Sequence, residues 1–311
     1  MTDRRHGQPT NHQQGLLFGL GAYGIWGAFP LYWPLLRPAG AVEILAHRVV
    51  WTLAVVLVLV AAGRHRRGRL RALWGRPRAL ATLGGGAVLI AINWGTYIWG
   101  VNHGQVVETS LGYFINPLVT VLLGVVILDE RLRPVQWLAI GIGAAACVVL
   151  TVDYGRPPYL AFVLAGSFGL YGLAKKSAGA GAVDSLAVET AVLAVPALVY
   201  LGILESGGQL AFGHVSPANT VLLALAGPVT AVPLLLFSAA VGRLALTTLG
   251  LLQYVTPVLQ FGVGVLVVHE TMPPARWLGF SFVWLALTIL SVSGMKRARR
   301  MRMPAVTEAA G

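Results

Sequence analysis

Apolar runs of roughly 20 residues, separated by short polar or Gly- and Pro-containing segments, follow one another along nearly the whole chain. A helix of that length crosses a hydrocarbon core of about 30 Å. The pattern therefore predicts an all-α polytopic membrane protein with ten transmembrane helices. They are expected near residues 15–36, 43–62, 79–101, 106–128, 134–152, 158–174, 185–204, 218–241, 246–268 and 274–295.

One segment of the chain occurs twice. Residues 108–137 align with residues 248–277 after a shift of 140 positions, and each copy is an apolar run with a proline near its middle. Equivalent pairs include Pro117 and Pro257, Glu130 and Glu270, and Trp137 and Trp277. A weaker echo relates residues 41–46 to residues 182–187. Each half would then hold five spans, and because five is odd the halves enter the membrane with opposite polarity. We expect two inverted five-helix repeats.

The repeat divides the chain into a polar tail (1–14), a first repeat (15–153), a second repeat (154–295) and a basic tail (296–311). The composition, 56% hydrophobic and 11% charged with a mean hydropathy of +0.73, excludes a soluble domain, in which about 25% of residues are charged. The single Cys147 lies inside an apolar run, and no phosphate-binding loop or cluster of His, Asp and Glu has metal-ligand spacing. We expect no cofactor and no metal.

The positive charge is distributed unevenly between the predicted loops. Nineteen of the 23 Lys and Arg residues lie in alternate segments: both tails, residues 64–78 and the shorter loops on the same side. Basic loops of membrane proteins face the cytoplasm, so both termini are expected there, in the bacterial inner membrane. The net charge of +12 is thus explained by topology, with membrane lipids as a partner for residues 64–71 and no nucleic-acid partner.

The two prolines of the repeat point to a polar centre. Pro117 and Pro257 lie midway along their runs, and each removes one helix hydrogen bond and frees the carbonyl four residues earlier, at Tyr113 and Gln253. We predict a helix kink at each proline. A freed carbonyl at bilayer depth needs a neighbouring helix, water or a ligand as its partner. Kinks satisfied by neighbouring helices are the alternative to a ligand site.

Neutral polar and aromatic residues near these prolines form the predicted substrate pocket. Asn93 and Tyr97 lie one helical turn apart on one face, which is expected to look into the bundle. The predicted lining is Asn93, Trp94, Tyr97, Tyr113, Asn116, Tyr171, Gln253 and Tyr254. With no full charge near its centre, such a pocket suits a neutral or zwitterionic solute. The alternative is that these side chains only join neighbouring helices.

Three charged residues fall inside apolar runs: Arg48, Glu108 and Glu189. Each is predicted to lie about one turn from a membrane boundary, where a charge snorkels or pairs. We expect structural roles for all three. Proton coupling or recognition of a substrate charge remains the alternative.

Several segments resemble the RarD family of EamA-domain proteins, within the drug/metabolite transporter superfamily. They include HRVVW (47–51), NWGTYIWGVNHGQVVETSLGYFINPL (93–118) and LGLLQYVTP (249–257). The resemblance runs from about Gly15 to Met295 and is most specific in 93–118. It implies two five-helix halves in the inner membrane and a transporter-like role, nominally linked to chloramphenicol sensitivity.

Together these features favour a secondary transporter, not an enzyme, that moves a small organic metabolite or drug-like solute by alternating access. One alternative is an integral-membrane enzyme acting on lipid-linked substrates. Such an enzyme would carry clustered acidic and histidine residues at a membrane boundary, and Glu43 with His47 is too small a cluster. Another is a non-transporting membrane sensor or assembly protein. Whether the chain forms a homodimer is left open.

Overall fold

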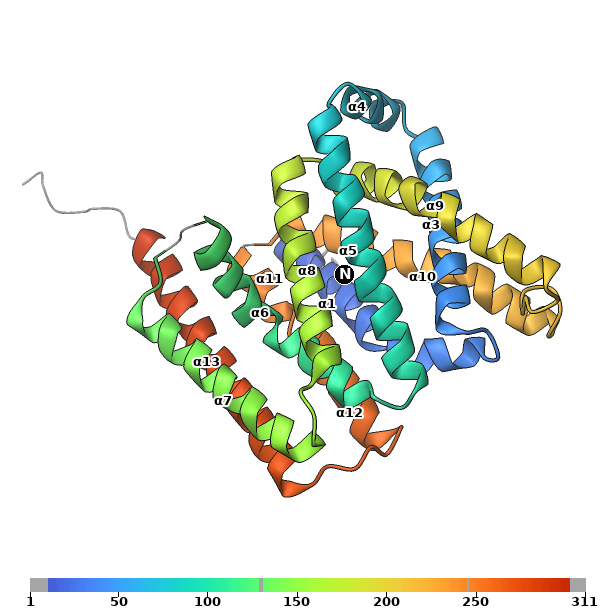
Figure 1. The fold of residues 1–311 in the computed structure, drawn as a ribbon. Coiled ribbons are helices and arrows are strands. Elements are labelled where there is room, and N and C mark those ends of the chain that lie inside the picture. Colours follow the sequence, from blue (N-terminus) through green and yellow to red (C-terminus); the bar gives the residue numbers. More distant parts are fainter. Residues whose placement is uncertain (1–10, 129–130, 245, 303–311) are drawn as a thin grey trace, which may run out of the picture.

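The computed structural model describes residues 11–128, 131–244 and 246–302, and within them the chain forms thirteen α-helices and one 3-10 helix (Figure 1). In chain order they are α1 (Asn11–Gly27), α2 (Phe29–Tyr32), η1 (Trp33–Leu36), α3 (Ala41–Ala61), α4 (Arg64–Trp74), α5 (Pro77–Asn102), α6 (Val106–Leu128), α7 (Pro134–Tyr154), α8 (Tyr159–Ala178), α9 (Ala182–Ser206), α10 (Pro217–Val241), α11 (Leu246–Leu252), α12 (Val255–Leu266) and α13 (Pro274–Arg302). Glu130 of the sequence repeat lies outside the described residues.

The predicted all-helical membrane class is confirmed, whereas the predicted count of ten spans is not. In the described part of the chain, eight segments are long and apolar enough to cross a membrane. A ninth is added if α1 and the α2–η1 segment, which meet at a bend of 42°, form one span. The sixth predicted span is present as helix α8, which ends with Lys175 and Lys176 and is not one of these eight segments.

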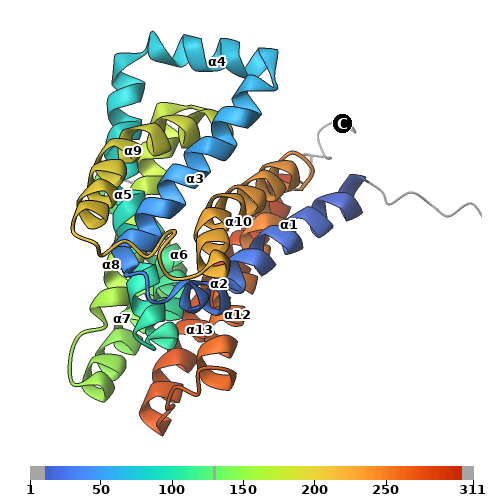
Figure 2. The ribbon, with the colours of Figure 1, turned by 90° about the vertical axis from the view of Figure 1, so that its right-hand side faces the viewer.

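Two details differ from the sequence-based expectation. The Arg-rich segment expected as a loop contains helix α4, which lies across the ends of α3 and α5 (Figure 2). The ninth run is divided into α11 and α12 at Gln253 and Tyr254, because Pro257 has no N–H to bond the Gln253 carbonyl. By contrast α6 continues through Pro117. The two equivalent prolines therefore have different effects on their helices.

Neighbouring helices come mostly from different parts of the chain. Helix α7 packs along α13 at one edge of the molecule (Figure 1), and α3 lies between α9 and α10. Helix α8 packs against α5 and α6, while α1 packs against α10 and α12. Helix α6 also contacts α12. The halves of the chain are thus interleaved.

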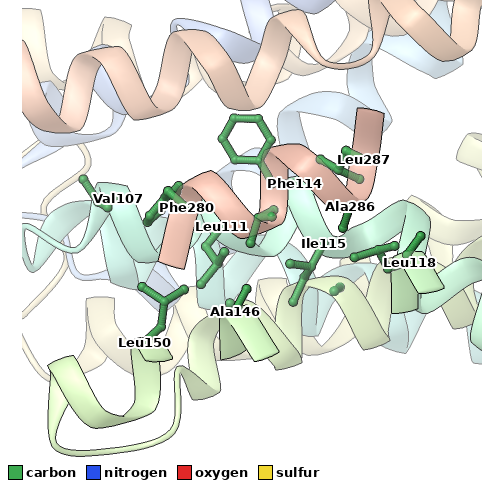
Figure 3. Packing of buried hydrophobic residues seen from close by; sticks show 14 residues of the cluster. Val107, Leu111, Phe114, Ile115, Leu118, Ala146, Leu150, Phe280, Ala286 and Leu287 are labelled. Atoms are coloured by element: carbon green, nitrogen blue, oxygen red, sulfur yellow. The ribbon is translucent and has the colours of Figure 1, made fainter. Parts of the chain in front are cut away.

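The largest hydrophobic core joins α6, α7 and α13 (Figure 3). Leu111, Phe114 and Ile115 of α6 lie against Phe280 of α13 and Leu150 of α7. The same core contains the small residues Ala139, Ala146, Ala161, Ala165 and Ala286. Helices in lipid associate through close packing rather than by leaving water, so small residues that let backbones approach favour this arrangement.

Helices α10 and α3 approach each other closely at Gly227. A Cβ atom added at Gly227 of α10 would lie 2.4 Å from the backbone carbonyl carbon of Trp51 in α3. Only glycine fits this contact. It sets the spacing of the two helices one turn from Thr230, whose side chain belongs to the site described below.

We expect Gly227→Ala to push α3 and α10 apart and to destabilise the protein by about 1–3 kcal/mol, the usual cost of overpacking. Thermal unfolding of the purified protein measures this as a lower melting temperature. Gly84→Ala is the matched control, because a Cβ at Gly84 has no atom within 4 Å. Equal melting temperatures for the two variants would contradict the proposed packing.

Candidate functional site

The structure places the predicted pocket residues in three groups. Asn93, Trp94, Tyr97 and Tyr113 lie around Arg48; Asn116, Pro117, Gln253 and Tyr254 line a separate cavity; and Tyr171 contacts Glu189. Pro257 is buried near the start of α12. One shared cavity for all of these side chains was expected, so the grouping is finer than the sequence pattern predicted.

Arg48 lies at the centre of the first group. It is the eighth residue of α3, roughly 10 Å from the start of the helix, and only 3% of its surface is exposed. Its Nε donates a hydrogen bond of 2.9 Å to Oγ1 of Thr230, near the middle of α10. Thr230 in turn donates to the carbonyl of Ala226. Arg48 is thus buried about two turns from the start of α3 and is joined to α10.

Aromatic rings enclose the Arg48 guanidinium. Its central carbon lies 3.8 Å from the ring centroid of Trp94, 5.1 Å from that of Trp33 and 5.5 Å from that of Phe29. A cation over an aromatic face is stabilised by about 2 kcal/mol or more when water is excluded. The three rings of Trp94, Trp33 and Phe29 form the aromatic cage of Arg48. Trp94, which was predicted to line a pocket with no full charge near its centre, therefore lies against a buried cation.

Next to this cage, Asn93 of α5 forms hydrogen bonds with two other helices, α6 and α8. Its Nδ2 donates to the Leu164 carbonyl at 2.9 Å and to Oγ of Ser167 at 3.1 Å, both on α8. Its Oδ1 accepts a hydrogen bond of 3.3 Å from the hydroxyl of Tyr113 on α6. The ring of Tyr97 packs edge-on against Tyr113, with centroids 5.5 Å apart. Asn93 is therefore engaged by protein partners, as the interhelical alternative anticipated.

No acidic side chain in the described part of the chain pairs with Arg48. The seven acidic residues of that part are all engaged elsewhere: Glu43 with the Ala211 amide, Glu108 with Arg156, Asp153 with Arg276, Asp184 with Arg69, Glu189 with Lys175, Glu205 with His214 and Glu270 with backbone amides of α6. A buried cation without a counter-ion is expensive at bilayer depth. Arg48 is thus set apart from the other buried charges.

Glu189 has the partners that Arg48 lacks. Its Oε2 accepts a hydrogen bond of 2.9 Å from the Tyr171 hydroxyl, and its Oε1 lies 3.6 Å from Nζ of Lys175. Lys175 also donates to the Tyr171 hydroxyl. The group joins the end of α8 to α9, so Tyr171 contacts an ion pair instead of the predicted pocket.

Two further carboxylates hold the ends of helices. Glu108 pairs with Arg156 at 2.7 Å and accepts a hydrogen bond from the Leu160 amide at 3.1 Å. Glu270, in the segment before α13, accepts hydrogen bonds from the amides of Val106 and Val107 at the start of α6. Burial raises the pKa of Glu270 to about 7, although the two amide donors act in the opposite direction. This contact therefore ties two distant segments and changes protonation near neutral pH.

The second group lines a cavity of about 330 Å³ between α6, α11 and α13. Asn116 and Pro117 contribute from α6, and Gln253 and Tyr254 from the break between α11 and α12. The Tyr254 hydroxyl lies 3.3 Å from Oγ of Ser291, and Oδ1 of Asn116 is buried without a hydrogen-bond partner among the described residues. Tyr113 is one turn before Asn116 on α6, so this cavity lies along the same helix face as the Arg48 group.

Phe29, Trp33 and Thr230 were not singled out from the sequence. The aromatic residues at positions 29, 32 and 33 follow helical spacing at the end of the first run, where they resemble the aromatic belt of a membrane interface. The available signal was Arg48 itself, because a cation inside an apolar run requires partners on neighbouring spans.

Comparison with known proteins identifies the family of the chain. Residues 13–152 match the EamA-like transporter family. "Protein RarD" of Streptomyces exfoliatus is 55% identical, over 94% of this chain and 93% of its own. "Uncharacterized transporter PA0485" of Pseudomonas aeruginosa is 41% identical, over 95% and 99%. A solved crystal structure matches in fold, with a TM-score of 0.56, 19% identity and coverage of 89% and 97%. The chain belongs to the RarD family of EamA-like membrane transporters.

Proposed function

We propose that this protein is a secondary transporter of the bacterial inner membrane that moves a small organic solute by alternating access between two inverted five-helix repeats. Its family membership makes it a multi-pass membrane protein related to transporters. The observation that carries the proposal is the position of the polar groups. The Arg48 group takes side chains from α3 and α5 of the first half and α10 of the second, and the cavity lies between α6 and α11–α13. In inverted repeats the interface between halves is where solutes bind.

The pattern of helix contacts supports an inverted repeat with α8 as the sixth span. In chain order, the first-half spans α1, α3, α5, α6 and α7 correspond to the second-half spans α8, α9, α10, α12 and α13. Under this correspondence the α1–α10 contact becomes α8–α5, and both contacts occur. The α1–α12 contact becomes α8–α6, and α3–α10 becomes α9–α5, which also occur. The pairs α3–α9, α6–α12 and α7–α13 exchange with themselves. A twofold axis in the membrane plane would produce this pattern.

We propose that helix α4 and both termini face the cytoplasm. The support is the concentration of Lys and Arg on that side, and the exposed side chains of Arg67, Arg71 and Trp74 on α4 suit contact with anionic lipid headgroups. In a Cys147→Ala background, an impermeant thiol reagent should label His103→Cys in intact cells and Ala72→Cys only after permeabilisation. The reverse result would overturn this orientation.

Transport is tested with a ligand found by a thermal-shift screen of metabolites and antibiotics, chloramphenicol included, because a ligand specific for the folded protein raises its melting temperature. The best radiolabelled ligand is then followed in proteoliposomes preloaded with the same compound. We expect saturable counterflow above that of protein-free vesicles. Binding without counterflow would favour the sensor or assembly role, and chemical conversion of the ligand would favour an enzyme.

A further inference from the structure

We infer that Arg48 binds the carboxylate of the transported solute, and that this carrier takes small organic acids with an apolar or aromatic body. The inference rests on the proposed transport function and names its substrate class. It departs from the neutral or zwitterionic solute suggested by the sequence, because the pocket residues Trp94 and Tyr97 lie beside a buried cation.

The Arg48 guanidinium retains most of its hydrogen-bonding capacity. It carries five N–H donors in a planar fork. Within the described residues only Nε has an acceptor, the hydroxyl of Thr230. The Nη groups form the edge of the fork that binds a carboxylate through two parallel hydrogen bonds. This edge has no protein acceptor in the described part of the molecule.

Other donors near Arg48 also lack acceptors. Nε1 of Trp33 and the hydroxyl of Tyr97 are buried without a hydrogen-bond partner among the described residues. The Trp33 ring is part of the cage, and Tyr97 lies close enough to Arg48 for an electrostatic interaction. Buried polar groups normally find partners. A local excess of donors and positive charge calls for a ligand that supplies acceptors and negative charge.

Two other arginines show how this chain neutralises a cation that has a structural role. Arg276 lies 2.8 Å from Asp153, and Arg156 lies 2.7 Å from Glu108. Both have a carboxylate partner supplied by the chain, whereas Arg48, which is more deeply buried, has none in the described residues. A purely structural role for Arg48 would leave this difference unexplained.

The sequence repeat strengthens the comparison. Residues 41–46 align weakly with residues 182–187, and extending this alignment by two positions pairs Arg48 with Glu189. Glu189 is neutralised inside the protein by Lys175 and Tyr171. Of two equivalent charged positions, one therefore has an internal counter-ion and the other is open to an external one.

The side chains around Arg48 indicate what the rest of the solute is like. Trp94, Trp33 and Phe29 form apolar walls around the cation, which suit a hydrocarbon or aromatic body better than a small inorganic anion. The separate neutral cavity lined by Asn116 and Gln253 begins one helical turn beyond Tyr113 on α6. Ligand sites commonly combine such apolar walls with a few polar groups that fix orientation.

The test uses matched compounds that differ only in the polar group. Full-length protein in phosphatidylcholine nanodiscs, which contain no anionic lipid, is titrated with benzoate, benzamide and benzylamine, with indole-3-acetate, indole-3-acetamide and tryptamine, and with hexanoate, hexanamide and hexylamine. Melting temperature and affinity are measured for each. We expect at least one acid to bind roughly tenfold to a hundredfold more tightly than its amide, the usual effect of a charge-assisted hydrogen bond. The amines should not bind.

Variants locate the effect. Arg48→Gln should abolish the preference for the acid, and Arg48→Lys, which keeps the charge but loses the planar fork, should weaken it about tenfold. Arg276→Gln is the matched control and should keep the full preference, because Arg276 is paired with Asp153. If Arg48→Gln does not fold, the comparison of Arg48→Lys with Arg276→Gln decides.

Three results would overturn the inference: no acid is preferred over its amide, the preference survives in the Arg48 variants, or anionic phosphatidylglycerol in the nanodiscs abolishes acid binding, which would assign the site to a lipid headgroup. The counterflow measurement distinguishes failure of this inference from failure of the proposed transport function. Acid binding at Arg48 without counterflow would confirm Arg48 as the carboxylate site and refute transport. Counterflow of an amide or amine that is independent of Arg48 would do the opposite.

Discussion

A cation held deep in an apolar helix bundle is the constraint around which this structure is arranged. Arg48 is almost fully buried, and among the described residues its guanidinium is stabilised by aromatic faces and one hydroxyl. Each of these comes from a different element. The bend after α1 allows Phe29 and Trp33 to reach the guanidinium, Trp94 comes from α5, and Thr230 comes from α10. The contact at Gly227 lets α10 approach α3 closely enough for the Thr230 hydrogen bond.

The duplicated unit has diverged in its chemistry while its packing partners still correspond. The helix contacts between the two halves are preserved when the spans are exchanged, yet the charge at position 48 is positive and that at 189 is negative. The negative position is neutralised by Lys175, which is built into the neighbouring helix. Similarly, the chain breaks before Pro257 but continues as helix through Pro117. Equivalent positions of the two halves therefore differ both in charge and in the course of the helix at the proline.

Helices and membrane class could be predicted from the sequence because they follow from local patterns. Every predicted apolar run coincides with one helix or with two or three consecutive helices. The candidate site was harder, since its geometry depends on how helices are rotated and how deeply they overlap. Asn93 and Tyr171 looked alike in sequence, as polar or aromatic residues on spans, but Asn93 joins α5 to α6 and α8 whereas Tyr171 contacts Glu189. The partners of Arg48 could not be predicted, because hydropathy along the chain does not show that Thr230 lies opposite it.

The central claim is that Arg48 is retained for a ligand and not for stability, and the melting temperature of the ligand-free Arg48→Met protein tests it most directly. Methionine fills a similar volume without the charge, so removal of an uncompensated buried cation should leave the melting temperature equal to or above that of the wild type. Arg276→Met, which breaks the ion pair with Asp153, should melt lower. A fall for Arg48→Met as large as that for Arg276→Met would contradict the account, because it would show that Arg48 supports the fold itself.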